Sequence, residues 1–164
     1  LKAGHSQSSV WWEWPLLTRP LWMFTHHTPE GSRVIYALGN PLLWWFFLPA
    51  LAHVAQRYLK LRQPGDGLIL CGFFGAWLPW AFIGRVTFIQ YLLPGVPFGV
   101  LAVATLLRDM TGAAGRWRLW LAGAYATLCV ATFLHFYPIL SAALVSRESL
   151  AGRQWFWIDS WRGY

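Results

Sequence analysis

The stretch VTFIQYLLPGVPFGVLAVATLL, residues 86–107, contains no aspartate, glutamate, lysine or arginine. A helix rises about 1.5 Å per residue and the hydrocarbon core of a bilayer is about 30 Å thick, so about 20 apolar residues are enough to cross it. The run is continuous and lacks the two-residue alternation that is typical of a membrane β-strand. We therefore expect a membrane-spanning helix here.

Further stretches of the chain share this character, because they too lack acidic and basic residues over nearly the length of a span. One of them contains Pro79, and another contains Pro138, near which that helix is expected to end or bend. The sequence thus predicts an all-α integral membrane domain of four helices, with an external segment before it and an external tail after it. The expected spans are 34–56, 67–84, 86–107 and 119–146, the external segment is 1–33, and the tail is 147–164.

The composition agrees with a membrane protein. Hydrophobic residues make up 57% of the 164 positions and charged residues only 12%, which is about half the share of roughly 25% in soluble proteins. Cys71 and Cys129 lie inside apolar runs without metal-binding spacing and are expected to be small buried hydrophobic residues. The chain begins with leucine and has no visible secretory leader, so we expect a piece of a longer protein.

The net charge of +7 predicts orientation rather than nucleic-acid binding, because the basic residues stand singly between apolar runs. The connections 57–66 and 108–118 each hold three basic residues and lie on the same side if there are four spans. Lysine and arginine are enriched in cytoplasmic loops, so both ends of the chain are expected outside the cytoplasm. Residues 1–33, the turn at Arg85 and the tail then share the outer face.

The external segment includes HSQSSVWWEWPLLTRPLWMF, residues 5–24, which is rich in tryptophan and proline. Pro15 and Pro20 exclude one long helix. Tryptophan rings settle at the membrane–water boundary, so the segment is expected to lie in that interface.

Few residues could carry chemistry. Arg85 between two expected spans is either a snorkelling topology marker or a cation for a lipid-linked phosphate, and the residues alone do not decide between these. His5 and Ser9 fit an ordinary polar loop better than a site. His53 and His135 are expected to form hydrogen bonds rather than a proton relay, since no carboxylate lies in any expected span.

The acidic residues give no catalytic pair. A transfer to a hydroxyl group needs a positioned base, and the acidic residues of the outer face are isolated in the sequence. Glu13, between Trp12 and Trp14, is a weak candidate because burial would raise the pKa of a carboxyl group there. The acidic residues of the outer face are Glu13, Glu30, Glu148 and Asp159.

Several motifs occur in the order found in one known family. They include the residue 5–24 stretch, LGNPLLWW at 38–45, LPWAFIGRVTFIQYLLPGVPF at 78–98, FYPIL at 136–140 and RQWFWIDSW at 153–161. Together they resemble the C-terminal four-span domain of the protein O-mannosyltransferases, especially the bacterial ones. The resemblance departs at Ser6 and Gln7, where the family usually has Pro-Tyr.

The resemblance implies a membrane glycosyltransferase of the GT-C type. Such enzymes transfer mannose, with inversion, from a polyprenyl-phosphate donor to Ser and Thr hydroxyls of exported proteins. No cofactor is implied beyond this donor. The family's catalytic acidic residues lie in an N-terminal half, so the partners would be that half, membrane lipid, the donor and the acceptor, in a bacterial plasma membrane.

By position, the resemblance implies roles for five residues. His5, Ser9, Trp12 and Arg19 would belong to a loop over the active site, and Arg85 would lie near the lipid phosphate. The alternative is a non-catalytic four-helix membrane module that binds a partner subunit or lipid. A small transporter is disfavoured because the spans offer few polar residues at mid-membrane depth.

Overall fold

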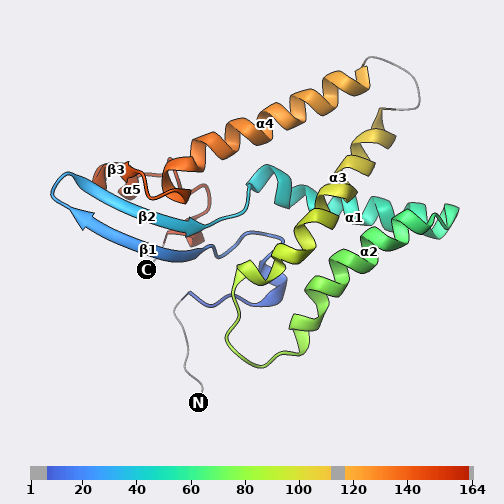
Figure 1. Cartoon of the computed structure of the whole chain (residues 1–164), viewed down its shortest axis with the longest axis horizontal. Helices are drawn as coiled ribbons and strands as arrows, with labels where there is room; N and C mark the ends of the chain where they lie inside the picture. The colour runs from blue at the N-terminus through green and yellow to red at the C-terminus, as the bar shows by residue number, and fades with distance from the viewer. Residues whose placement is uncertain (1–6, 112–116, 163–164) are drawn as a thin grey trace.

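The computed structural model describes residues 7–111 and 117–162, which form a group of helices and a small antiparallel sheet that projects from it (Figure 1). The long helices are α1 (Pro41–Leu61), α2 (Pro64–Trp77), α3 (Val96–Met110) and α4 (Trp117–Leu140), and the strands are β1 (Leu21–Thr28), β2 (Gly31–Ala37) and β3 (Leu144–Val145). Shorter elements are the 3-10 helices η1 (Trp11–Glu13), η2 (Leu78–Phe82), η3 (Ile89–Gly95) and η4 (Asp159–Trp161) and the helix α5 (Arg147–Ala151).

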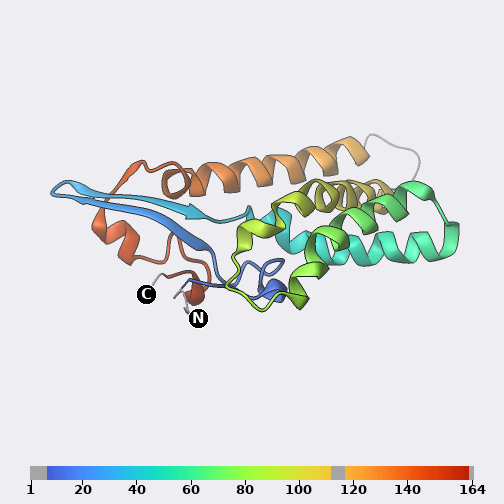
Figure 2. The same cartoon turned by 60° about the horizontal axis from the view of Figure 1, so that its bottom comes forward.

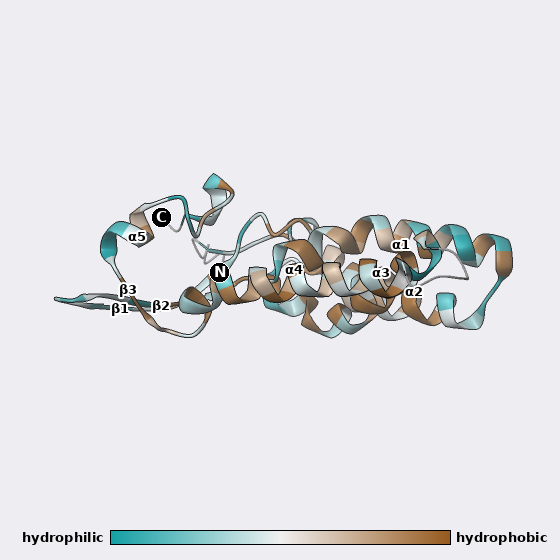
Figure 3. Cartoon of the chain, turned by 90° about the horizontal axis from the view of Figure 1, so that it is seen from above, coloured by the Kyte–Doolittle hydropathy of each residue, from teal (hydrophilic) through white to brown (hydrophobic). Residues whose placement is uncertain are grey.

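The helical part has the dimensions of a membrane domain. Among the described residues, three helical segments are long and apolar enough to cross a bilayer, namely Pro64–Phe82, Ile89–Met110 and Leu119–Leu140. α1 has 21 residues and carries His53, Gln56, Arg57 and Lys60 in its second half. Coloured by residue hydropathy, the helices are largely apolar, while hydrophilic residues are found at the hairpin tip and the α1–α2 turn (Figure 3). The predicted helical membrane fold is confirmed.

α4 lies at the edge of this helical group and runs alongside it (Figure 2). Only 11% of its apolar window is buried within the chain, and Leu119, Trp120 and Leu134 are exposed. Two hydrogen bonds attach its middle to the start of α1: the Asn40 side-chain amide donates to the Cys129 carbonyl oxygen (2.7 Å), and the Tyr125 hydroxyl donates to the Leu42 carbonyl oxygen (3.0 Å). Apolar side chains with no protein neighbour are what a lipid-facing helix presents.

The sheet differs from the expected external loop. The stretch 31–37 alternates, so that Ser32, Val34 and Tyr36 are buried while Arg33 is exposed. This two-residue period and the β-branched and aromatic residues favour a strand. The first expected span began at residue 34, yet residues 34–37 belong to β2. The helix begins at Pro41, because Asn40 accepts a hydrogen bond from the Leu43 amide as its N-cap and proline fits the first turn.

Other helix boundaries also differ from those predicted from the sequence. α2 ends at Trp77, two residues before Pro79, and α3 continues to Met110, beyond the expected end at residue 107. α4 ends at Leu140, close to Pro138 as predicted. Both cysteines were expected to be buried, but Cys71 is exposed on α2 and Cys129 is half-buried.

α1 and α3 approach closely at Gly99, where a Cβ atom would lie 2.7 Å from a ring carbon of Phe47. Substituting Gly99→Val should therefore lower the free energy of unfolding by about 1–3 kcal/mol, the usual cost of overpacking. The measurement is unfolding of the purified protein in detergent, followed by tryptophan fluorescence. Gly75→Val on α2 is the matched control, since nothing lies within 4 Å of a Cβ atom there. Equal stability of the two variants would contradict the close contact.

Candidate functional site

The segment before β1, which keeps the name external segment for its expected position only, is fixed to the connection between α2 and α3. The Ser9 amide donates to the Thr87 carbonyl oxygen (3.0 Å), and the Thr87 hydroxyl donates back to the Ser9 carbonyl oxygen (2.7 Å). Both side chains are buried. Trp77 near the end of α2 adds a third link, because its indole N–H donates to the Trp11 carbonyl oxygen (2.7 Å). Segments far apart in the sequence thus meet at one end of α2 and α3.

Three aromatic rings form a platform at this junction, which we call the aromatic platform: Trp14, Trp80 and Tyr91. The Trp80 and Tyr91 rings stack with centroids 4.4 Å apart and 6° between planes. Trp14 packs edge-on against both, at 5.9 and 6.2 Å. Its indole N–H donates to the Ser9 hydroxyl oxygen (3.0 Å) and the ring is fully buried, so the external segment holds the platform in place.

Arg85 lies over this platform. Its guanidinium carbon is 5.8 Å from the centroid of Trp80 and 5.7 Å from that of Tyr91, within the range of cation–π attraction. The residue is exposed, and no carboxylate of the described chain pairs with it. The forked donors of this cation are therefore available to an anionic group, and the rings limit its orientations.

Glu13 and Arg19 form a second pair in the external segment. A Glu13 carboxylate oxygen lies 3.4 Å from Arg19 Nε, and the other accepts the Val10 amide (2.9 Å). Glu13 is only 8% exposed. Both of its oxygens are thus engaged, which fixes η1. Trp12 is 52% exposed, and His5 lies outside the described residues.

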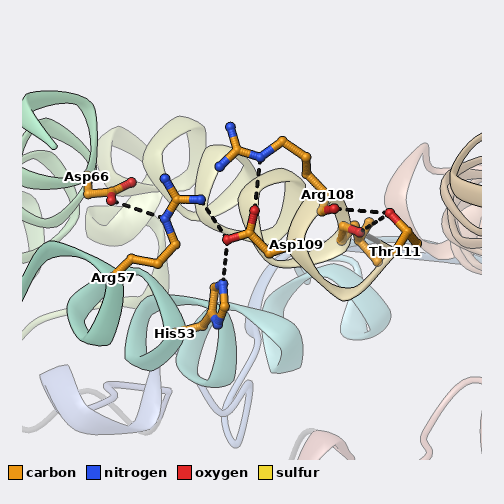
Figure 4. Close-up of polar contacts among 7 residues, drawn as sticks. His53, Arg57, Asp66, Arg108, Asp109 and Thr111 are labelled. Atoms are coloured by element: carbon orange, nitrogen blue, oxygen red, sulfur yellow. Dashed lines mark hydrogen bonds and ion pairs between the residues drawn. The ribbon is translucent and has the colours of Figure 1, made fainter. Parts of the chain in front are cut away.

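A polar cluster lies at the other end of α2 and α3 (Figure 4), and we call it the helix-end ion network: His53, Arg57, Asp66, Arg108 and Asp109. Arg57 of α1 joins two acidic residues, with Nε 3.1 Å from Asp66 and Nη1 2.6 Å from Asp109. His53 Nε2 is 2.9 Å from the same Asp109 oxygen. The network connects α1, α2 and α3 where each begins or ends.

This network was not predicted from the sequence. The expected hydrogen bond of His53 is confirmed, but its partner is a carboxylate, which was not expected, because α3 extends beyond residue 107 and carries Asp109 to the histidine. A signal was present, since His53 and Arg57 are four residues apart and share one face of a helix. For His135 the expected hydrogen bond is confirmed: its Nε2 is 2.8 Å from the Gln154 carbonyl oxygen in the tail.

The structure brings together only part of the predicted site. Ser9 supports the aromatic platform under Arg85, whereas Arg19 pairs with Glu13 on the external segment. Trp80, Tyr91 and Trp14 were not predicted as site residues. Trp80 lies five residues before Arg85 and Tyr91 six residues after it, so their proximity to Arg85 could have been predicted from the sequence. The position of the buried Trp14 could not have been predicted, since this residue comes from a distant segment.

Known proteins match this chain along nearly its whole length. A family model described as the C-terminal four TMM region of protein-O-mannosyltransferase matches residues 1–161. The polyprenol-phosphate-mannose–protein mannosyltransferase of Mycobacterium tuberculosis (strain ATCC 25618 / H37Rv) is 27% identical over 96% of this chain and 33% of its own length. The protein of the same name from Corynebacterium glutamicum is 27% identical over 98% of this chain and 33% of its own length.

A solved structure has the same fold. It is the Saccharomyces cerevisiae protein O-mannosyltransferase Pmt1–Pmt2 complex bound to the sugar donor, which matches with a TM-score of 0.71 and 22% identity over 96% of this chain and 24% of the other. The chain therefore spans about a third or less of the length of these relatives.

Proposed function

This chain belongs to the protein O-mannosyltransferase family, whose C-terminal four-transmembrane region it matches, and from this premise we propose that it is the membrane portion of an enzyme that moves mannose from a polyprenyl-phosphate donor to Ser and Thr hydroxyls of exported proteins. The names of its curated relatives, which are protein mannosyltransferases, support the reaction. We call the longer protein that would contain this chain the complete enzyme.

The observation that carries the proposal is Arg85 over the aromatic platform. A lipid-linked phosphate lies at headgroup level, and a guanidinium can bind two of its oxygens. In the proposed role Arg85 holds the donor phosphate and stabilises the negative charge that grows on it as the bond to mannose breaks. The stacked rings keep the guanidinium in place before the donor arrives, which lowers the cost of ordering it.

The other residues of the external segment take supporting roles in this proposal. Ser9 positions the aromatic platform through Trp14, and Glu13 holds Arg19 and η1. Trp12 and Arg19 are exposed and, with His5, would face the donor and acceptor as the loop over the site. Glu13 is not assigned the base, because both of its oxygens are engaged. The acidic residues that activate the acceptor are assigned to the N-terminal half of the complete enzyme.

We also propose that the enzyme lies in a bacterial plasma membrane with the aromatic platform outside. Arg57, Lys60, Arg62 and Arg108 gather at the opposite end of the helices, as expected for the cytoplasmic side. The anionic inner leaflet attracts such side chains. In intact cells, a thiol reagent that does not cross the membrane should label an engineered cysteine at Ser160 and should not label one at Gln63.

Because the acidic residues that activate the acceptor are assigned to the N-terminal half of the complete enzyme, we expect that this chain alone transfers no mannose. Membranes that contain the complete enzyme should label a Ser/Thr peptide from radioactive polyprenyl-phosphate-mannose, and membranes that contain only residues 1–164 should not, because the base is absent. Western blotting for both proteins controls for insertion. Transfer by the chain alone would contradict the placement of the base. Undiminished transfer by a complete enzyme without these residues would favour the non-catalytic module instead.

A further inference from the structure

A groove lies between the β-hairpin and α5, on one face of the sheet. The register pairs Trp22 with Tyr36 and His27 with Ser32. A β-bulge after Trp22 adds one residue to β1, and this extra residue lets Trp22 and His27 point to the same face although they are five positions apart. The ring stacking of Trp22 on Tyr36 (5.0 Å) and the His27–Ser32 hydrogen bond (2.7 Å) agree with this placement.

The groove consists of two adjoining hollows, of about 460 and 140 Å³, which share Trp22 and two residues of α5. Ligand pockets are usually about 300–1,000 Å³, so the larger hollow alone is of binding size. We call the whole the hairpin groove, and the residues that define it are Trp22, His27, Ser32, Tyr36, Arg147 and Arg162.

The chemistry of the hairpin groove suits an extended polypeptide. Its floor is aromatic, with Phe156 packed edge-on against Tyr36 (5.6 Å). His27 uses Nδ1 for the buried Ser32, and its exposed ring presents Nε2 to a hydroxyl or carbonyl group. An arginine lies in each hollow, Arg147 in one and Arg162 in the other, and no acidic side chain lines either among the described residues. The charge therefore matches a neutral or acidic segment.

The hairpin groove is connected to the aromatic platform by the C-terminal tail. The Ser160 hydroxyl donates to the Thr18 carbonyl oxygen (2.6 Å), and the Trp161 indole N–H donates to the Leu17 carbonyl oxygen. Arg162 of the groove directly follows Trp161, Arg19 directly follows Thr18, and Trp14 of the aromatic platform lies three residues before Leu17. The tail therefore joins the hairpin groove to the segment that supports the aromatic platform.

We propose that the hairpin groove binds an extended segment of the acceptor polypeptide that carries Ser or Thr hydroxyls and at least one carboxylate. This inference rests on the proposed function, whose acceptor it concerns. The aromatic floor takes apolar side chains, His27 and Ser32 meet hydroxyl and peptide groups, and the two arginines select acidic over basic sequences. The groove thus gives the enzyme a preference among exported proteins, apart from the residues that touch the donor.

The test is binding of fluorescein-labelled peptides to the complete enzyme in nanodiscs without donor, followed by anisotropy. One peptide alternates threonine and alanine around an aspartate, and a second has lysine in place of the aspartate. Arg147→Gln and Arg162→Gln should each weaken binding of the acidic peptide by about fivefold, as expected for loss of one partly exposed ion pair. Arg153→Gln is the matched control, because this exposed arginine of the same tail lines neither hollow.

Arg147 also donates to the Thr28 carbonyl oxygen (3.1 Å), so weaker binding by Arg147→Gln could reflect a structural change in the hairpin. Arg162→Gln therefore provides the second, independent test of the charge. Equal affinity of the wild type and the Arg162→Gln variant, or equal binding of the acidic and basic peptides, would overturn the proposal. Mannose transfer to the acidic peptide with an unchanged acceptor KM in both variants would overturn it while the proposed function stands. Selective binding without any mannose transfer would contradict the proposed function and leave the groove assignment intact.

Discussion

Replacing Arg85 with alanine is expected to reduce kcat/KM of the complete enzyme for polyprenyl-phosphate-mannose by about a hundredfold, the usual effect of removing one donor that stabilises charge in a transition state. The guanidinium lies over the Trp80 and Tyr91 rings without a carboxylate partner among the described residues, so its charge is available to the donor. Arg85→Lys should fall between the wild type and alanine, because it keeps the charge but loses the forked donors.

The measurement is transfer of radioactive mannose to a Ser/Thr peptide at several donor concentrations. Arg62→Ala is the matched control, since Arg62 also lies over a tyrosine ring, that of Tyr58 at 5.6 Å, but follows α1 at the opposite end of the helices. Both variants should insert and unfold like the wild type, because substitutions of exposed residues usually change stability by less than about 0.5 kcal/mol. If Arg85→Ala and Arg62→Ala have equal activity, Arg85 is a topology marker only.

Replacing Arg57 with alanine is expected to lower the free energy of unfolding by about 3 kcal/mol, because it leaves the buried Asp66 carboxylate without its cation. Asp66 is only 4% exposed, and Arg57 is its one ion-pair partner among the described residues. Asp109 would keep His53 and Arg108. Most of the loss thus comes from Asp66 at the start of α2.

Unfolding in detergent by added sodium dodecyl sulfate measures this loss. Arg108→Ala is the control within the same network, since Arg108 is 48% exposed and exposed ion pairs contribute about 0–1 kcal/mol. The double variant Arg57→Leu/Asp66→Leu should recover much of the stability, because replacing both partners removes the buried charge. If Arg57→Ala were no less stable than Arg108→Ala, the network would not connect the three helices.

The helical part of the fold could be predicted because each run is apolar over a bilayer thickness. The hairpin could not be separated from the first span, since Val34–Ala37 is apolar and no charged residue divides it from α1. In the site, Arg85 was found from its position between two apolar runs. The helix-end ion network was missed because its members come from three helices, with Arg57 and Asp109 52 positions apart.

The hydrogen bonds from Ser160 and Trp161 to the external segment join residues 142 and 144 positions apart. This separation determines when these contacts can form during synthesis and folding. The ribosome synthesises the tail after α1 to α5, so the Leu17 and Thr18 carbonyl groups have no tail partner until Ser160 and Trp161 have been added. Contacts between distant positions form late because closing a long loop costs entropy before the contact is made. A product truncated just before Asp159 would therefore contain α1 to α5, yet it would lack the two hydrogen bonds that attach Leu17 and Thr18 to the tail.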